Sequence, residues 1–431
     1  MSTLVVSPSA ALCGRMRVPG DKSISHRALL LGALAEGPSR VYGFLPSADC
    51  RATLHCLRML GVRIEEADPT TLVVHGRGLL GLSPPPDALD CGSSGTTMRL
   101  LSGMVAGQPF RSVLTGSEQL RHRPMTRVTA PLRQMGARVI DTQGHAPLTI
   151  EGGQLHGVDY APPVASAQVK SAILLAGLYA DSATTVREPG PSRDHTERML
   201  CAMGADLELD GLSITLRPGR PLQSRHVNVP GDISSAAFLV AAAVMVPGSC
   251  VTVENVGVNP TRTGALDALQ SMGAEIRVED RRQCSGEPVS TVTSKASGLR
   301  AVKIGGATVP RLIDELPLLA LVATQAQGTT VIRDAAELRV KETDRIASTA
   351  AELLKMGADI EPRPDGLIVR GPSLLVGTDV ESHGDHRLAM TLAVAGLVAE
   401  GRTLVHDVDC ISDSFPGFAD TLRRLGADLA C

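Results

Sequence analysis

Positively charged side chains in this sequence recur beside residues that can begin a helix, a pairing that favours anion binding. Lys22 and Arg27 belong to Pro19-Gly-Asp-Lys-Ser-Ile-Ser-His-Arg27, which leads into the apolar run 28–35. The N-terminus of a helix already attracts anions, so two added cations cost free energy unless an anion binds there. Nearly the same residues recur at 229–234 as Val-Pro-Gly-Asp-Ile-Ser, without the lysine and the arginine. We interpret the shared residues as architecture and the two cations as chemistry.

A glycine- and hydroxyl-rich stretch, Asp90-Cys-Gly-Ser-Ser-Gly-Thr-Thr-Met-Arg99, runs into another predicted helix. Its backbone N–H groups and hydroxyls suit a phosphate or a carboxylate, although an ordinary capped turn has the same composition. Arg123 precedes Pro124 and is therefore predicted to be extended. This arginine fits either a solvated loop or a bidentate clamp for an anion.

Two further polar stretches also open predicted helices. Ser166, in Ala165-Ser-Ala-Gln-Val-Lys-Ser171, is a natural N-cap, and capping alone explains it. Capping does not explain Gln168 in the first turn, so this side chain is a candidate for ligand contact. Arg193 lies in Pro191-Ser-Arg-Asp-His-Thr-Glu197, where a capped helix start is again the simpler interpretation.

The densest charge run in the chain is 333–345, where a solvated helix with i,i+3 and i,i+4 ion pairs is the default interpretation. The apolar residues that follow it predict a helix from near Thr343, which leaves Lys341 and Glu342 at the helix entrance. Asp314 is a carboxylate bounded by aliphatic residues. It fits either a helix cap or a general base.

A final helix entrance, His383-Gly-Asp-His-Arg387, contributes Arg387 as a candidate. Each helix dipole contributes only about 0.3–1 kcal/mol, whereas a charge-assisted hydrogen bond contributes about 1.5–3 kcal/mol. The cations would therefore dominate binding, and their number indicates substrates with several negative charges. The cations near helix entrances are Lys22, Arg27, Arg99, Arg123, Lys341, Arg345 and Arg387.

The elements that position these residues follow an internal repeat. A leucine and a Met or Leu three residues later lie on one helix face, and the glycine after them ends the helix in a left-handed cap. Six segments fit Leu-x-x-(Met/Leu)-Gly-(Ala/Val): Leu57–Val62, Leu132–Ala137, Leu200–Ala205, Leu269–Ala274, Leu353–Ala358 and Leu422–Ala427. Alternating residues follow most of them and predict half-buried strands.

A second signal precedes each of these segments: a small polar cluster opens an Ala/Leu-rich helix, and a β-branched strand follows it. The predicted openings are Ser23, Ser94, Ser166, Ser234, Asp314 and Asp385. Each unit of about 70 residues thus holds two helices and several strands, which predicts a sixfold α/β repeat. The two Val-Pro-Gly-Asp segments divide it into domains of three units each, 20–228 and 1–19 plus 229–431. We expect a two-stranded hinge and an active site in the cleft between the domains.

Composition excludes several classes of protein. With 431 residues the chain is long enough for two cores, and aromatic residues make up only 2%, so these cores are aliphatic. A net charge of −3 argues against a nucleic-acid partner. The nine cysteines show no metal-ligand spacing, so we expect no structural zinc, no disulfide framework and a reducing, cytoplasmic location. The longest apolar run, Ala236–Val246, is too short to span a membrane. We expect a monomer.

The motifs resemble the EPSP synthase (3-phosphoshikimate 1-carboxyvinyltransferase) family over essentially the whole chain. The residues that carry the resemblance are Pro19–Arg27, Gly92–Arg99, Arg123-Pro124, Ser166-Ala-Gln168, Leu338–Arg345, Asp385-His-Arg387 and Ser414-Phe-Pro416. The resemblance implies two domains, each of three βαβαββ units arranged as an inside-out α/β barrel. It also implies transfer of the enolpyruvyl group of phosphoenolpyruvate to the 5-hydroxyl of shikimate 3-phosphate, in chorismate biosynthesis, without metal or cofactor.

The resemblance further implies a role for individual residues. Asp314 is the base for the 5-hydroxyl, and Glu342 with Lys22 takes part in proton transfer to the methylene carbon. The implied shikimate 3-phosphate ligands are Lys22, Ser23, Arg27, Ser166, Gln168, Arg193, Asp314 and Lys341. The implied phosphoenolpyruvate ligands are Lys22, Gly95, Arg123, Gln168, Arg345 and Arg387.

Two departures and two alternatives accompany this interpretation. Ser93 stands where many family members have Asn, and Asp413 where some have Lys, so neither is given a role. The related UDP-N-acetylglucosamine enolpyruvyl transferase carries a reactive cysteine in the loop corresponding to 115–123, which has none here. A non-catalytic protein that binds phosphorylated metabolites would need the cations but not Asp314 and Glu342.

Overall fold

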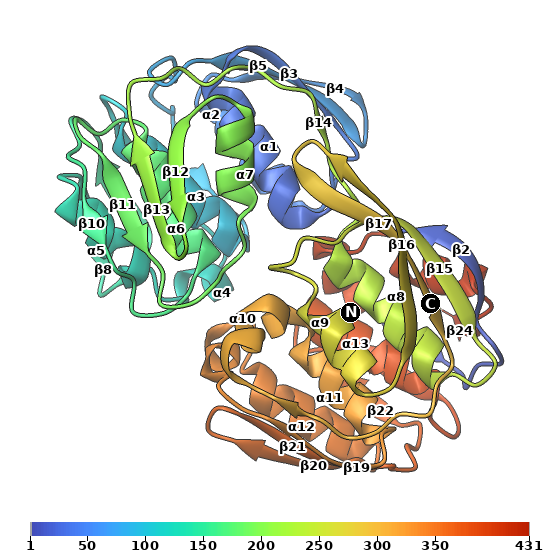
Figure 1. Ribbon diagram of the computed structural model, residues 1–431. Coiled ribbons are helices and arrows are strands. Elements are labelled where there is room, and N and C mark those ends of the chain that lie inside the picture. The colour runs from blue at the N-terminus through green and yellow to red at the C-terminus, as the bar shows by residue number, and fades with distance from the viewer. Residues whose placement is uncertain (1, 431) are drawn as a thin grey trace. The chain divides into compact units, whose positions relative to one another are not determined.

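The computed structural model describes residues 2–430, which divide into two compact units (Figure 1). The N-terminal unit comprises Gly20–Val229 together with Gln283–Glu287. The C-terminal unit comprises Met1–Pro19, Pro230–Arg282 and Pro288–Cys431. The chain therefore passes between the units four times. The boundaries placed at the two Val-Pro-Gly-Asp segments account for the first two of these crossings.

Three four-stranded sheets form the N-terminal unit, and all share one strand order. In each sheet a two-residue strand pairs in parallel with a longer one, and an antiparallel hairpin completes the sheet. In spatial order the sheets are β14 (Val227–Asn228), β3 (Glu36–Tyr42), β5 (Thr71–Arg77), β4 (Arg63–Asp68); β6 (Leu89–Asp90), β7 (Arg111–Thr115), β9 (His145–Glu151), β8 (Arg138–Thr142); and β10 (Asp159–Tyr160), β11 (Thr184–Arg187), β13 (Ser213–Arg217), β12 (Asp206–Asp210).

The C-terminal unit repeats the same three sheets. The N-terminal segment supplies β1 and β2 to two different sheets, which explains why residues before 20 belong to this unit. In spatial order the sheets are β2 (Cys13–Arg17), β15 (Cys250–Gly257), β17 (Glu287–Lys295), β16 (Glu275–Cys284); β18 (Lys303–Ile304), β19 (Gly328–Ile332), β21 (Gly366–Gly371), β20 (Asp359–Arg363); and β22 (Asp379–Glu381), β23 (Thr403–His406), β1 (Thr3–Val6), β24 (Leu429–Ala430).

Each unit is filled by three helices that are apolar on all sides, as buried helices are. They are α1 (Lys22–Leu34), α3 (Gly95–Ala106) and α6 (Ala167–Gly177), and α8 (Ile233–Met245), α11 (Leu316–Thr324) and α13 (His386–Gly396). Small residues allow close packing: a Cβ on Gly103 of α3 would lie 2.1 Å from the carbonyl oxygen of Ala172 in α6. The result is one aliphatic core per unit, with the sheets outside the buried helices (Figure 1).

Six outer helices end at the repeat glycines, as predicted. They are α2 (Ala48–Met59), α5 (Thr126–Gln134), α7 (His195–Ala202), α9 (Gly264–Ser271), α12 (Arg345–Lys355) and α14 (Phe418–Arg424). Their glycines have φ between +82° and +106°. In every case the next N–H donates to the carbonyl of the motif leucine at 3.0–3.1 Å, which is the Schellman hydrogen bond. The predicted sixfold α/β repeat of βαβαββ units is therefore confirmed.

The helix openings were predicted less accurately. Ser94, Ser166 and Asp385 cap their helices, but Asp21 rather than Ser23 caps α1, and Asp232 rather than Ser234 caps α8. Each aspartate precedes the predicted serine and reaches the first free N–H groups itself. Short helices α4 (Glu118–Arg121) and α10 (Val309–Leu312) and four 3₁₀ turns (Gly306–Thr308, Ile313–Glu315, Ala336–Val340, Val408–Asp413) complete the structure. Across residues 2–430, none of the helices has the length and apolar character needed to cross a membrane.

Candidate active site

The predicted site residues form two groups, one in each unit, at or near the starts of helices. We call the first group the N-terminal half-site: Lys22, Ser23, Arg27, Gly95, Arg123, Ser166, Gln168 and Arg193. The second group is the C-terminal half-site: Asp314, Lys341, Glu342, Arg345 and Arg387.

Arg27 is a buried cation held by neutral groups. Its side chain, in the second turn of α1, is 3% exposed. The guanidinium donates to the hydroxyl of Thr196 at 2.6 Å, the hydroxyl of Ser171 at 2.8 Å and the carbonyl of Ser23 at 3.0 Å. Burial lowers the pKa of Arg27 to about 10, although the carboxylate of Glu197 opposes this shift. A guanidinium fixed in this way retains its charge for an anionic ligand.

Lys22 is positioned by a residue that the sequence did not single out. Its ammonium lies 3.0 Å from the carboxylate of Asp49, in the first turn of α2. A chain of buried hydrogen bonds runs from the ring of His26 through the hydroxyls of Thr53 and Thr97, at 2.7 Å each, and so joins α1, α2 and α3. Burial lowers the pKa of His26 well below its ordinary value, so the ring is neutral. The three helix starts are thus fixed to one another without added charge.

Gly95, Arg99, Arg123 and Gln168 lie together at the starts of α3 and α6. The Arg99 guanidinium donates to the Gln168 amide oxygen at 2.7 Å, and the Gln168 amide nitrogen donates to the Thr96 hydroxyl at 2.8 Å. A Cβ on Gly95 would lie 2.8 Å from Nη1 of Arg99 and 3.0 Å from Nη1 of Arg123. Glycine therefore lets two guanidinium groups approach the backbone at a helix start, which suits a small anion.

The remaining N-terminal candidates are half-buried. The hydroxyl of Ser166 accepts from the N–H of Val169 at 3.4 Å, so this residue caps α6 as expected. Ser23 lies in the first turn of α1. Arg193 lies in the irregular segment between β11 and α7.

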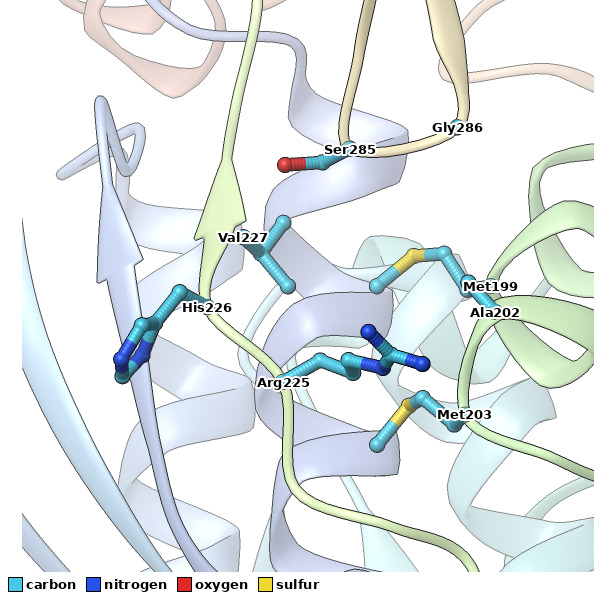
Figure 2. A pocket seen from close by; sticks show the side chains of 8 residues that line it. All are labelled: Met199, Ala202, Met203, Arg225, His226, Val227, Ser285 and Gly286. Carbon is cyan, nitrogen blue, oxygen red and sulfur yellow. The ribbon is translucent and has the colours of Figure 1, made fainter.

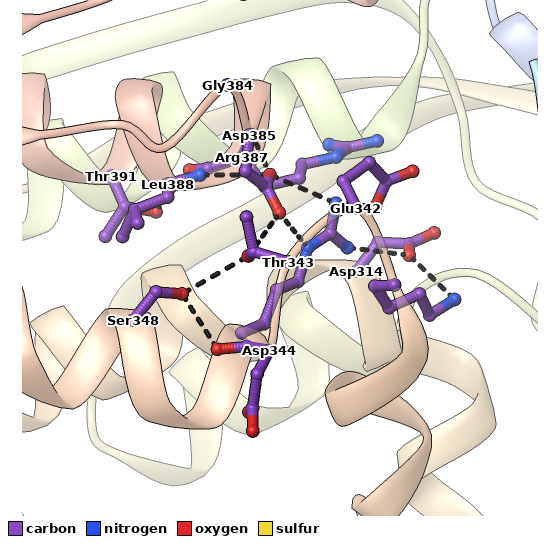
Figure 3. Close-up of polar contacts among 12 residues, drawn as sticks. Asp314, Glu342, Thr343, Asp344, Ser348, Gly384, Asp385, Arg387, Leu388 and Thr391 are labelled. Atoms are coloured by element: carbon purple, nitrogen blue, oxygen red, sulfur yellow. Dashed lines mark hydrogen bonds and ion pairs between the residues drawn. The ribbon is translucent and has the colours of Figure 1, made fainter. Parts of the chain in front are cut away.

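Arg345 is the centre of the C-terminal half-site, and Figure 3 shows its carboxylate partners Asp314, Glu342 and Asp385. Its side chain is 2% exposed and contacts three carboxylates: Asp385 at 2.7 Å, Glu342 at 2.6 Å and Asp314 at 3.4 Å. Burial alone would lower the pKa of Arg345, but these carboxylates raise it above its usual value. Arg345 therefore stays charged and holds together residues from three separate parts of the chain.

Asp314 lies in the 3₁₀ turn Ile313–Glu315, before α11 begins at Leu316, and so does not cap that helix. Lys341 lies 3.5 Å from the same carboxylate oxygen that Arg345 contacts. The helix predicted from near Thr343 begins at Arg345, because Asp344 caps it. Lys341 and Glu342 therefore precede this helix, as expected, and the structure brings both close to Arg345 or Asp314.

Arg387 differs from Arg345 in its surroundings. Asp385 caps α13 by accepting from the backbone N–H of Arg387 at 2.8 Å (Figure 3). The Arg387 side chain is only 5% exposed, yet within residues 2–430 its guanidinium forms no hydrogen bond or ion pair. Such a buried, unpaired cation is expected where an anion binds.

A separate cavity of about 240 Å³ lies in the N-terminal unit (Figure 2). Met199 of α7 and Met203, which follows this helix, line it together with Arg225, Val227 and Gly286. No predicted site residue lines this cavity. In the described part of the chain, no three His, Cys, Asp or Glu side chains are grouped so as to hold a metal ion.

The fold and the two half-sites define a two-domain α/β protein with buried cations suited to small anionic substrates. A family model for EPSP synthase (3-phosphoshikimate 1-carboxyvinyltransferase) matches residues 6–422. The 3-phosphoshikimate 1-carboxyvinyltransferases of Desulforudis audaxviator and Pelotomaculum thermopropionicum are 54% and 56% identical to this chain. These alignments cover 98% and 99% of the chain and 99% of each relative.

A solved structure of EPSP synthase from Acinetobacter baumannii superimposes with a TM-score of 0.89 at 44% identity and covers 100% of both chains. The chain therefore belongs to the EPSP synthase family. Its relatives are named as carboxyvinyltransferases, and it is an enzyme of this transferase class.

Proposed function

We propose that this enzyme transfers the enolpyruvyl group of phosphoenolpyruvate to the 5-hydroxyl of shikimate 3-phosphate and releases phosphate. The supporting observation is a pair of buried arginines, one in each unit, that lack a carboxylate contact. Arg27 has only neutral partners, and Arg387 has none within the described residues. Two phosphorylated carboxylates supply the anions that such groups need.

We assign the binding residues to the two substrates as follows. Shikimate 3-phosphate contacts Lys22, Ser23, Arg27, Ser166, Gln168 and Arg193 of the N-terminal half-site, with Asp314 and Lys341. Phosphoenolpyruvate contacts Lys22, Gly95, Arg123 and Gln168, with Arg345 and Arg387. The space above Gly95, which two guanidinium groups border, supports the second assignment. Both half-sites act on the same two substrates, whose negative charges match the cations of each half-site.

The chemistry is an addition followed by an elimination. Asp314 accepts the 5-hydroxyl proton as the oxygen attacks the central carbon of phosphoenolpyruvate, while Glu342 and Lys22 deliver a proton to the methylene carbon. The resulting tetrahedral ketal then loses phosphate and a methyl proton, which regenerates the double bond. Holding the two substrates in contact supplies up to about 7–11 kcal/mol of the rate enhancement. No metal or cofactor takes part in these steps.

The test is phosphate release from phosphoenolpyruvate by the purified enzyme. We expect release with shikimate 3-phosphate, undiminished by a chelator, and none with UDP-N-acetylglucosamine. Release with the sugar nucleotide instead would identify the related enolpyruvyl transferase. Binding of shikimate 3-phosphate without any release would identify a non-catalytic metabolite-binding protein.

We further propose that the enzyme works as a cytoplasmic monomer and needs no nucleic acid or membrane partner. The net charge of −3 supports the absence of a nucleic-acid partner, and the cysteine spacings support a reducing, cytoplasmic location. Sedimentation at assay concentration tests the oligomeric state.

A further inference from the structure

Lys170 is a buried lysine that the proposed chemistry does not use. It lies on α6 two residues after Gln168, and its side chain is 1% exposed. Its ammonium contacts the carboxylates of Glu188 and Glu197, both at 2.6 Å and both buried. Desolvating these three charges costs several kcal/mol per ion, so this arrangement persists only because the contacts are close.

The two carboxylates mark the ends of an irregular segment, 188–197. Glu188 follows β11, and Glu197 lies in the first turn of α7. Between Glu188 and Asp194 the chain contains two prolines and a glycine and forms neither helix nor strand. The hydroxyl of Ser192 donates to Glu188, which folds the segment back toward Lys170. One lysine therefore ties both ends of this segment to α6.

The same segment carries two groups of the N-terminal half-site. Arg193 directly follows Ser192 and is a proposed ligand of shikimate 3-phosphate. Thr196 accepts the 2.6 Å hydrogen bond from Arg27 and contacts the hydroxyl of Ser171 at 2.6 Å. A shift of the segment would move Arg193 and loosen Arg27 together.

We propose that Lys170 is a positioning residue for shikimate 3-phosphate: by neutralising Glu188 and Glu197 it fixes the segment that carries Arg193 and Thr196. This inference rests on the proposed function for its effect on the substrate. Its effect on the segment does not depend on that function.

The charges around the segment determine how the lysine acts. Burial raises the pKa of Glu197, whereas Lys170 lowers it and Asp194 adds to the rise. One oxygen of Glu197 has no hydrogen-bond partner in the described part of the chain. The guanidinium of Arg27 in α1 is attracted by the carboxylates of Glu197 and Glu287 and repelled by the guanidinium of Arg193. The His195 ring lies 2.7 Å from Glu287, and both side chains are buried.

Removing the lysine charge leaves carboxylates in excess at this place. Lys170→Met keeps most of the aliphatic stem, but Glu188 and Glu197 then lack their cation. Burial already raises the pKa of Glu197, and loss of Lys170, which lowers it, raises it further. At low pH Glu197 is protonated and the segment stays in place. As the pH rises Glu197 ionises beside Glu188, and the repulsion displaces the segment, so the defect grows with pH.

The experiment compares steady-state kinetics of the parent enzyme and Lys170→Met at about pH 6 and about pH 8.5. We expect the KM for shikimate 3-phosphate to rise about tenfold at the higher pH and much less at the lower pH, with the KM for phosphoenolpyruvate within about twofold. The control is Lys295→Met, because Lys295 also pairs with a glutamate, Glu275 at 3.1 Å, but is 43% exposed. This control should match the parent at both pH values.

Hydrogen exchange of the 188–195 backbone amides provides a readout that requires no activity. We expect faster exchange in Lys170→Met than in the parent, with the larger difference at the higher pH. If the single variant does not fold, Lys170→Met/Glu188→Gln restores the parent net charge of the cluster. In that double variant we expect protection factors lower than those of the parent, by the same ratio at the two pH values.

Parent-like exchange in a folded variant would overturn the inference whatever the enzyme catalyses. Equal increases in the two KM values would also overturn it, because they indicate a general structural role. A parent enzyme without shikimate 3-phosphate-dependent phosphate release would instead refute the proposed function. The exchange experiment would then still decide the role of Lys170.

Discussion

Arg27 and Arg345, one buried arginine in each half-site, are held in opposite ways. In the N-terminal half-site, hydroxyls and a carbonyl hold Arg27, and an amide oxygen accepts from Arg99. In the C-terminal half-site, three carboxylates surround Arg345. The first arrangement leaves the charge of Arg27 uncompensated by a direct carboxylate contact, whereas the second compensates the charge of Arg345. In the function proposed above, the first arrangement serves substrate binding, and the second also holds the carboxylates proposed to move protons.

The starts of α1 and α8 show the same contrast within nearly identical sequences. Asp21 accepts from the N–H of Ile24, and Asp232 accepts from that of Ser234. Beside α8, however, the buried guanidinium of Arg262 contacts Asp232 at 3.2 Å and Ser234 at 2.8 Å. An internal ion pair occupies the place corresponding to the cationic start of α1, so here the helix start serves the fold.

Asp314→Asn tests the assignment of proton transfer to the C-terminal half-site and should have the largest effect. We expect kcat to fall about 10²–10⁴-fold because the general base is lost, with the KM for shikimate 3-phosphate changed only a few-fold. Steady-state kinetics check this prediction. The control is Asp267→Asn, whose carboxylate pairs with Arg311 and is 49% exposed. A KM that rises as much as kcat falls would make Asp314 a binding residue and remove the contrast.

Arg345→Met tests the charge balance of that half-site through stability. We expect a loss of about 3–5 kcal/mol, because three carboxylates lose their cation in a buried place. Like charges then lie close together without a cation between them, which accounts for the loss. Urea unfolding at neutral pH measures it. Arg370→Met, at an exposed pair of carboxylates, should cost less than about 1 kcal/mol.

Arg27→Met tests the binding role of the N-terminal half-site. Loss of a charge-assisted contact worth about 1.5–3 kcal/mol should raise the KM for shikimate 3-phosphate about 10–150-fold. The stability loss should be smaller than for Arg345→Met, because the groups left behind are neutral. Titration calorimetry and urea unfolding measure the two effects, with the 71% exposed Arg138→Met as control. A stability loss equal to that of Arg345→Met would contradict the contrast.

Gly204→Ala and Gly426→Ala test what the two units share and should have the smallest effect. Both glycines end repeat helices with φ of +88° and +106°, and an added Cβ meets its nearest atoms at 3.8 Å and 3.4 Å. We expect each substitution to cost about 1–2 kcal/mol through left-handed strain alone. Urea unfolding compares them with Gly153→Ala, which has open space and no positive φ. Clearly unequal costs would show that the caps differ between the units.

Local patterns predicted the repeat because each repeat carries its own signal. The six helix-ending glycines appear in the sequence with the leucines whose carbonyls accept the capping hydrogen bonds. The pattern predicted two helices and several strands in each unit, whereas the βαβαββ order was implied by the family resemblance. The cations were found because basic residues beside apolar helix starts are unusual.

Partners from distant parts of the chain were not predicted, because no spacing encodes them. Asp49 contacts Lys22 across 27 residues, and Thr196 contacts Arg27 across 169. Asp385 belonged to a predicted motif, but its contact with Arg345 depends on how α12 and α13 pack. The five residues 283–287 also gave no local sign that they belong to the N-terminal unit.

The assignment of residues 283–287 to the N-terminal unit has a practical consequence for producing the two units as separate fragments. A gene fragment ending at Val229 would lack Glu287, and the ring of His195 would remain in an apolar interior without its acceptor. The complementary fragment would carry residues 283–287, at the turn between β16 and β17, without the rest of the N-terminal unit to which they belong. Pieces cut at the apparent linker should therefore fold best when they are produced together.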